Sequence, residues 1–327
     1  MDSQLLLDGS LPLPPDPETA EDWQWTRREF QGTDALRGVA SELELAEVAF
    51  ERVTCGEVEF PDERGVSFAG RLVGICTVSS TYSLIQNRNV LLELAERLDE
   101  AKLVPWGVVH ESPFGHMSAK VFFENPEYKL NIALGVTDQT TLIHLGLAVE
   151  NSYGRPYVGL RTDCIGYAPQ GEDLFFFSRT VGKASFRHVG KMGRNILKAL
   201  THLTTRSPFL ARRIAESCEF KLDEQAPYLA LRGLGFGKRT ANAITEGGPA
   251  LTRTWSSPVS AWALYHAGIA LYSKKPVSEC HRDESRRRLE RLLLVHKVDG
   301  VVKRGKAIVA KEDGIELEEA LAEDEDE

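Results

Sequence analysis

The sequence is poor in cysteine and in long apolar segments. Its five cysteines are scattered through 327 residues and none forms a C-x-x-C pair, which is typical of reduced thiols in a cytoplasm and not of a disulfide framework. No apolar run approaches the roughly 20 residues of a membrane helix, and no basic-then-apolar leader opens the chain. We therefore expect a cytoplasmic protein that does not enter a membrane.

Motifs for metal or nucleophile chemistry are also missing. The eight histidines show no H-x-x-x-H spacing, and there is no G-x-S-x-G elbow for a catalytic serine. We expect no catalytic residue, no metal and no cofactor. One enzyme pattern stays open, a metal-dependent nuclease in which Glu111 or Asp99 joins the triplet Glu127-Tyr128-Lys129 around a divalent ion.

Acidic charge dominates the whole sequence but not every part of it. The net charge of -9 argues against a nucleic-acid partner, because a protein that binds phosphates needs clustered lysine and arginine. However, residues 1–173 carry a net -15, residues 174–311 a net +16 and the last sixteen residues a net -10. Residues 174–215 contain nine basic side chains and no acidic one. This distribution favours a polyanion as the partner of the middle segment.

The patterns of apolar residues predict an α+β fold, an antiparallel β-meander packed against helices and followed by a helical C-terminal region. Period-two segments joined by short turns predict strands over 106–110, 117–123, 128–136, 142–149, 157–165 and 174–177, with one turn at Asn151–Gly154 and with residues 73–78 paired to the same sheet. Helical spacing predicts helices over 87–102, 188–203, 207–214, 258–271 and 283–295, and Ser207-Pro208 has the order of an N-cap and first helical residue.

Composition divides the chain into four regions. We expect an irregular acidic arm over residues 1–33, an α+β core with a basic helix over 34–215, a helical region over 216–305 and a disordered acidic tail over 306–327.

A basic ridge is the strongest local feature. On the predicted helix, Arg187, Lys191, Arg194 and Lys198 share one face, while apolar residues hold the opposite face against the sheet. Such a ridge suits a phosphate backbone. Nearby, Phe175, Phe176, Phe177 and Phe186 include candidates for a platform that stacks unpaired bases, although strand alternation sends about half of them into the core. The alternative is a solvated amphipathic helix whose cations meet the acidic parts of the chain.

A glycine-rich segment lies at residues 231–244. It lacks the spacing of a phosphate-binding loop and looks more like a helix-hairpin-helix element, with Lys238 and Arg239 beside a Gly-Phe-Gly turn. The alternative, which we favour, is a C-cap glycine followed by a tight turn between two helices.

Several segments resemble a family of phage-, plasmid- and prokaryote-encoded proteins known as domain of unknown function 932. The matching segments are Thr77–Tyr82 with Ile85–Asn87, Val149–Gly154, Gly159–Cys164, Ser185–His188 and Trp262–Ala267. Family members usually follow the cysteine with an asparagine and a hydroxyl residue, whereas this chain has Cys164-Ile-Gly-Tyr. The resemblance implies a mobile-element or genome-maintenance setting and a core similar to single-strand annealing proteins of the Rad52 and Redβ kind.

Together these features favour a nucleic-acid-binding protein that binds and anneals single-stranded DNA in recombination, repair or mobile-element replication. The predicted contacts are Arg155, Arg161, Lys183, Phe186, Arg187, Lys191, Arg194, Lys198, Lys238 and Arg239. Because weak phosphate contacts gain from multivalency, we expect a homo-oligomer. The acidic tail has three open roles: it covers the ridge, recruits a protein partner or only improves solubility. The alternatives to DNA binding are the nuclease and a phage structural or protein-interaction protein.

Overall fold

The computed structural model describes residues 25–43, 48–55, 58–68, 70–77, 85–112, 115–133, 140–154, 157–169, 173–178, 192–223, 225–246, 258–275, 277 and 279–313. The chain forms two compact units. The first comprises Met1–Tyr128, Leu145–Cys164 and Ala184–Thr204, and the second comprises Lys129–His144, Ile165–Lys183 and Thr205–Glu327.

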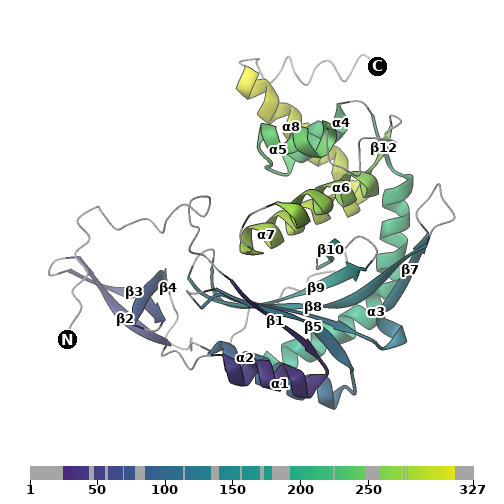
Figure 1. Cartoon of the computed structure of the whole chain (residues 1–327). Coiled ribbons are helices and arrows are strands. Elements are labelled where there is room, and N and C mark those ends of the chain that lie inside the picture. Colours follow the sequence, from purple (N-terminus) through teal and green to yellow (C-terminus); the bar gives the residue numbers. More distant parts are fainter. Residues whose placement is uncertain are drawn as a thin grey trace. The chain divides into compact units, whose positions relative to one another are not determined.

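An antiparallel meander forms the main sheet (Figure 1), so the predicted α+β class is confirmed. Its strands are β1 (Thr26–Gln31), β5 (Pro105–Glu111), β6 (Met117–Phe123), β7 (Lys129–Ala133), β8 (Thr140–Gly154), β9 (Tyr157–Ala168) and β10 (Asp173–Phe176). Their order among the described residues is β1-β5-β6-β8-β9-β10, with β7 paired to the first part of β8. Strand β6 matches its predicted bounds because its apolar run is flanked by turn residues on both sides.

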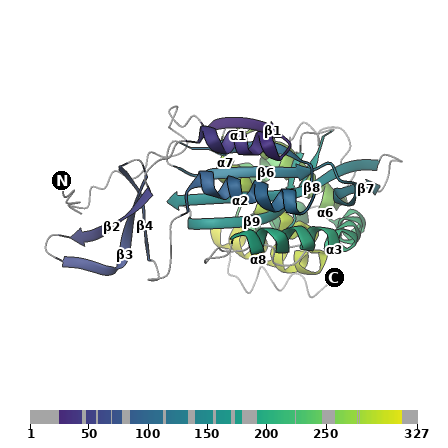
Figure 2. The same cartoon turned by 90° about the horizontal axis from the view of Figure 1, so that it is seen from below.

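In the first unit, two helices cover one face of this sheet (Figure 1 and Figure 2). They are α1 (Thr33–Glu42) and α2 (Asn87–Glu100), and α2 confirms the predicted helix. Leu91, Leu94 and Leu98 of α2 are fully buried. The opposite face of the sheet carries buried polar side chains. In the ladder between β6 and β8, Ser118 lies opposite Glu150 and Lys120 lies opposite Ala148, and the three polar side chains are buried.

Two predictions for the N-terminal part are wrong. Residues 26–31 form edge strand β1 and not an irregular arm, because Arg27 to Gln31 pair in register with β5. Residues 71–77 form β4 of a separate three-stranded sheet with β2 (Val48–Cys55) and β3 (Val58–Phe68), and they do not pair with the meander. The connection between β3 and β4 is short and contains Gly70 at φ 74°. Pairing β4 with β3 therefore closes a shorter loop, at a smaller cost in entropy, than pairing β4 with the meander would.

The predicted turn at Asn151–Gly154 is also wrong, because these residues are the end of strand β8. Asn151 pairs with Met117 of β6 in the ladder. Its buried side chain bonds the start of α2, so the asparagine serves the strand and not a turn. A tertiary hydrogen bond has overridden the local turn preference of Asn and Gly.

Helix α3 (Met192–Glu219) corrects the prediction of a new helix at Ser207-Pro208. Pro208 lies inside this continuous helix, where it removes one backbone donor and costs about 3 kcal/mol. The helix persists because Leu203, Leu210 and Ile214 are fully buried on both sides of the proline. Packing therefore outweighs the proline signal.

The rest of the second unit is helical. It contains α4 (Ala226–Gly233), α5 (Lys238–Glu246), α6 (Ala261–Lys274), α7 (Glu279–Leu289) and α8 (Val298–Asp313), with a short β11–β12 pair (Lys221–Leu222 and Val259–Ser260) and two 3-10 turns (Glu290–Leu293 and Val295–Lys297). Helices α6 and α7 pack on β10, and α4 packs on α8 (Figure 1). The α6 and α7 helices confirm the predictions for 258–271 and 283–295 with shifted ends. Among the described helices, none is both long and apolar enough to cross a bilayer.

Candidate nucleic-acid interface

Five of the ten predicted nucleic-acid contacts lie outside the described residues. This applies to Arg155, Lys183, Phe186, Arg187 and Lys191, and of Arg194 only the backbone, in α3, is described. Lys198 is exposed on α3, as its place on the predicted ridge requires. The prediction of a disordered tail over residues 306–327 is wrong for residues 306–313, which belong to helix α8, and residues 314–327 lie outside the described part of the chain.

Arg161 has a structural partner. Its Nε lies 2.8 Å from Oδ2 of Asp163, whose side chain is completely buried two residues further along β9. A buried carboxylate needs a counter-charge, because burying one without it costs several kcal/mol. Arg161 therefore already neutralises a charge inside the first unit, which weakens its predicted role as a phosphate contact.

The aromatic platform is wrong for the three phenylalanines that the structure describes. Phe175, Phe176 and Phe177 are at most 1% exposed. Phe175 packs against Trp262 and Tyr265 of α6, with ring centroids 5.6 Å apart in both pairs. The alternation predicted for this strand fails because β10 is covered by helices α6 and α7, so these rings belong to the core and cannot stack on bases.

The glycine-rich segment forms the C-cap that we favoured. Gly235 has φ 88° and follows α4, while the N–H of Phe236 donates to the carbonyl of Leu231 at 3.1 Å. With the bond from Gly235 N–H to the Arg232 carbonyl at 2.9 Å, this is a Schellman motif. The motif turns the chain directly into α5, so that Lys238 and Arg239 lie on its first turn.

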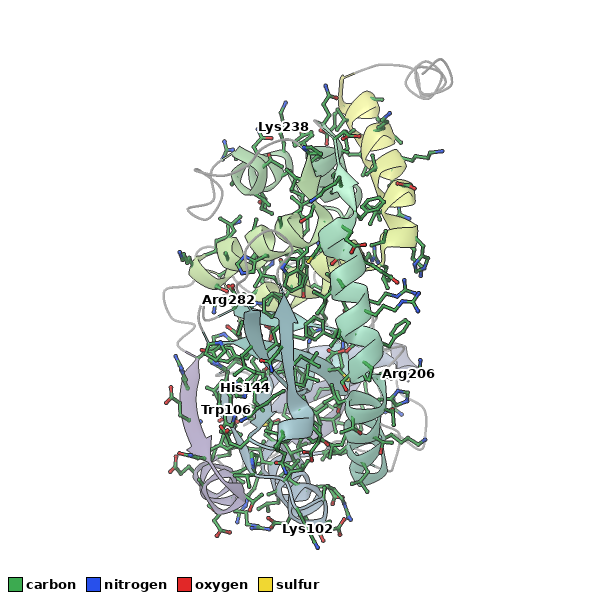
Figure 3. The ribbon with its side chains drawn as sticks, turned by 90° about the vertical axis from the view of Figure 1, so that its right-hand side faces the viewer. Lys102, Trp106, His144, Arg206, Lys238 and Arg282 are labelled. Carbon is green, nitrogen blue, oxygen red and sulfur yellow. The ribbon has the colours of Figure 1, made fainter. Side chains whose placement is uncertain are left out.

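Lys238 and Arg239 are both exposed, and neither forms an ion pair with any residue that the structure describes. Figure 3 shows Lys238 at the start of α5. The first N–H groups of a helix have no intrahelical acceptor and carry partial positive charge. Two free cations beside these donors make the α4–α5 turn an electropositive surface.

A buried arginine fixes this turn to α8. Arg232 is 4% exposed, and its Nη1 donates to the carbonyl of Phe236 at 3.1 Å. Its Nη2 bonds the carboxylate of Glu312 on α8. Arg232 therefore holds the turn that presents Lys238 and Arg239 in a defined position against α8.

A second group of exposed cations lies on α8, where no site was predicted from the sequence. These residues are Lys303, Arg304 and Lys311. Their helical spacing was the signal that could have revealed them, but without the bounds of α8 it could not be assigned to a surface.

Three of the four arginines of α7, in contrast, are held by contacts within the fold. Arg286 Nη1 lies 2.9 Å from Oδ1 of Asp283 and 3.4 Å from Oε1 of Glu279, and Arg282 also pairs with Glu279. Arg287 lies over the ring of Phe176 at 4.6 Å from its centroid. These cations stabilise the fold and are not available to a ligand.

Two of the segments that carry the family resemblance meet in the first unit. The side-chain Nδ2 of Asn151 donates to the Ile85 carbonyl and to Oδ1 of Asn87, both at 2.8 Å, and the Tyr153 hydroxyl donates to the Ile85 carbonyl at 2.8 Å. All three polar side chains are at most 5% exposed. This network holds the start of α2 against the sheet, which is a structural role.

A third such segment lies in the core of the second unit. Burial raises the pKa of Tyr265, whose hydroxyl bonds the backbone of Phe176. The next residue, His266, places Nε2 at 2.7 Å from Oδ2 of the buried Asp173. Both contacts join α6 to β10, so this segment also serves packing.

Two of the three carboxylates of the nuclease alternative, Glu111 and Asp99, have partners in the fold. Glu111 accepts a hydrogen bond from Asn87 at 3.0 Å and lies 3.6 Å from Arg28. Asp99 pairs with Arg37, and hydrogen bonds from Thr33 and Arg37 hold the pKa of Asp99 below its ordinary value. In the described part of the chain, no three His, Cys, Asp or Glu side chains are grouped so that they could hold a metal ion.

No protein-family model, no curated protein and no solved structure matches the chain.

Proposed function

We propose that this protein binds nucleic acid through its phosphate backbone, with a preference for single strands. The observation that supports the proposal is the pair of exposed, unpaired cations, Lys238 and Arg239, on the first turn of α5. Cations that already pair with buried carboxylates, such as Arg161 and Arg286, have little to offer a phosphate. Free cations beside helix N–H donors suit one, because phosphate accepts hydrogen bonds and carries negative charge.

The rest of the proposal rests on the sequence. The net +16 of residues 174–311 concentrates the positive charge in one stretch of the chain, and Lys198 is exposed within it. The resemblance to the domain of unknown function 932 favours recombination, repair or mobile-element replication as the setting, in the cytoplasm. Annealing of complementary strands and assembly into a homo-oligomer are part of the same proposal, because many weak phosphate contacts gain from multivalency.

Salt-dependent binding to a labelled single-stranded oligonucleotide tests the proposal. The double variant Lys238→Gln/Arg239→Gln should make the slope of log K against log salt shallower by about 1.4, since each phosphate contact to a single strand contributes about 0.7. The matched control is Arg27→Gln/Lys102→Gln, which removes the same charge from exposed positions of the first unit and should leave the slope unchanged.

Three outcomes separate the alternatives. A protein that fails to bind single- or double-stranded DNA at low salt would contradict the proposal and would favour a structural or protein-interaction role. Degradation of the labelled strand only with Mg²⁺ or Mn²⁺ would favour the nuclease. Equal slopes for the double variant and its control would show that the α4–α5 turn does not contact the strand.

A further inference from the structure

Helix α8 presents a stripe of positive charge that no sequence motif marks. Lys303, Arg304 and Lys311 are all exposed. At 3.6 residues per turn they fall within an arc of about 100° on one side of the helix. None of the three side chains forms an ion pair or a hydrogen bond with a residue that the structure describes. Figure 3 shows nitrogen-tipped side chains projecting outward from α8.

Two small residues lie between these cations on the helix surface. Gly300 and Ala307 lie on the same side of α8, and a Cβ at Gly300 would meet nothing within 4 Å. Small residues let a ligand approach the helix closely and let the long cationic side chains reach it from both sides. Lys303 and Lys311 lie eight residues apart, which is about 12 Å along the helix. At about 3.4 Å per phosphate along one strand of a B-form duplex, that length covers about three to four phosphates.

The helix is held rigidly from behind. A Cβ at Gly305 would lie 1.8 Å from the carbonyl oxygen of Leu229, and one at Gly233 would lie 1.9 Å from that of Val301, so the backbones of α4 and α8 are in direct contact. The Arg232–Glu312 pair adds a second connection. A rigid support keeps the stripe in one geometry, which lowers the entropy cost of binding.

We infer that the α8 stripe, Lys303, Arg304 and Lys311, is a binding surface for the sugar-phosphate backbone of nucleic acid. The inference rests on the proposed function and adds a surface to it. A stripe of three free cations without large apolar side chains binds through counterion release and does not read bases. The contacts are therefore independent of sequence.

The absence of apolar side chains on the stripe argues against a membrane surface as the ligand. A helix that lies on a membrane inserts Trp, Phe or Leu beside its lysines. The exposed large apolar residues among those that the structure describes are Val104 and Leu197, and neither lies on α8. Nucleic acid is the polyanion that fits a cationic stripe without large apolar side chains.

Neutralisation of the stripe in the full chain tests the inference. The triple variant Lys303→Gln/Arg304→Gln/Lys311→Gln should make the salt slope for a single-stranded oligonucleotide shallower by about 2, because three contacts of about 0.7 each are lost. The matched control removes three charges from the first unit, as Arg27→Gln/Arg88→Gln/Lys102→Gln, and should keep the original slope. Unchanged far-UV circular dichroism and an unchanged melting temperature exclude unfolding as the cause.

The outcomes distinguish this inference from the proposed function. If the unaltered protein binds no nucleic acid, the proposed function fails. If it binds with a salt-dependent affinity and the triple variant keeps the same slope, only the α8 surface is overturned. Vesicles that contain phosphatidylserine provide the last arm: binding to them that depends on the stripe, together with an unchanged slope for DNA, would assign the stripe to a membrane surface instead.

Discussion

Helices α7 and α8 carry the same charges and use them in opposite ways. Each has four Lys or Arg and three Asp or Glu. In α7, Arg286 and Arg287 are 4% exposed and are held by carboxylates or by an aromatic ring. In α8, Lys303, Arg304 and Lys311 extend into solvent without an ionic partner among the described residues. The number of cations in a segment therefore does not say how many a ligand can use.

Burial explains the difference. Helix α7 packs against α6 and β10, so its central cations lose their water and need counter-charges within hydrogen-bond distance. Helix α8 contacts α4 through two glycines, and the charges on its outer side stay hydrated. The same composition thus stabilises the fold in one helix and remains free for binding in the other.

Removal of one α7 arginine should reduce the stability of the fold more than any other change considered. Arg286→Met leaves Asp283, which is fully buried, and Glu279 without their shared cation. We expect the free energy of unfolding to fall by about 3–5 kcal/mol in urea titrations. The matched control, Arg304→Met on α8, should change it by about 0.5 kcal/mol or less. Similar losses for the two variants would show that α7 and α8 do not differ in the way that burial suggests.

The sequence predicted the α+β class because local patterns control it. Strand β6 and helix α2 have apolar residues at the spacing of one element and clear breakers at their ends, so both were found. Errors occurred where a distant contact overrides a local signal. Asn151 is a residue type typical of turns, but its side chain bonds Ile85 and Asn87. Pro208 is typical of a helix start, but it lies between buried leucine and isoleucine side chains within α3.

The candidate interface could be predicted only in part. Gly235 predicted the α4–α5 turn, because a positive φ after a helix favours glycine. The positions of Lys238 and Arg239 beside the turn could then be predicted as well. The burial of Phe175 could not be foreseen, since it depends on α6, which comes about 90 residues later in the chain. The partner of Arg161 could have been suspected, because Asp163 follows two residues later on the same strand face.

Loss of the glycine contact that supports α8 should lower the free energy of unfolding by an intermediate amount. Gly305→Ala places a methyl group against the Leu229 carbonyl, and backbone cannot rotate away as a side chain can. The two helices must separate, and we expect a loss of about 1–3 kcal/mol in the free energy of unfolding. Gly300→Ala, on the same helix but in open space, should be neutral or stabilise the protein by up to about 1 kcal/mol. Equal effects of the two substitutions would refute the direct backbone contact.

A partly exposed ion pair on α3 should have the smallest effect and depend on pH. Burial opposes ionisation of Glu216, but hydrogen bonds from Arg212 and Arg213 outweigh it and lower its pKa below 4.5. A lowered pKa in the folded state means that the carboxylate stabilises the fold above pH 4.5 and that this contribution is lost as the pH falls through the folded pKa. Glu216→Gln should therefore cost about 0.3–1 kcal/mol at pH 7, because the pair is partly hydrated.

The cost of Glu216→Gln should then disappear under acid conditions, where the natural glutamate is protonated as well. Unfolding curves for the variant and the unaltered protein should converge as the pH falls below the lowered pKa of Glu216 in the folded protein. Glu219→Gln, an exposed position on the same helix, controls for the change in net charge and should have almost no effect at either pH. A pH-independent loss for Glu216→Gln would show that its arginine contacts contribute through packing, as buried residues do, and not through charge.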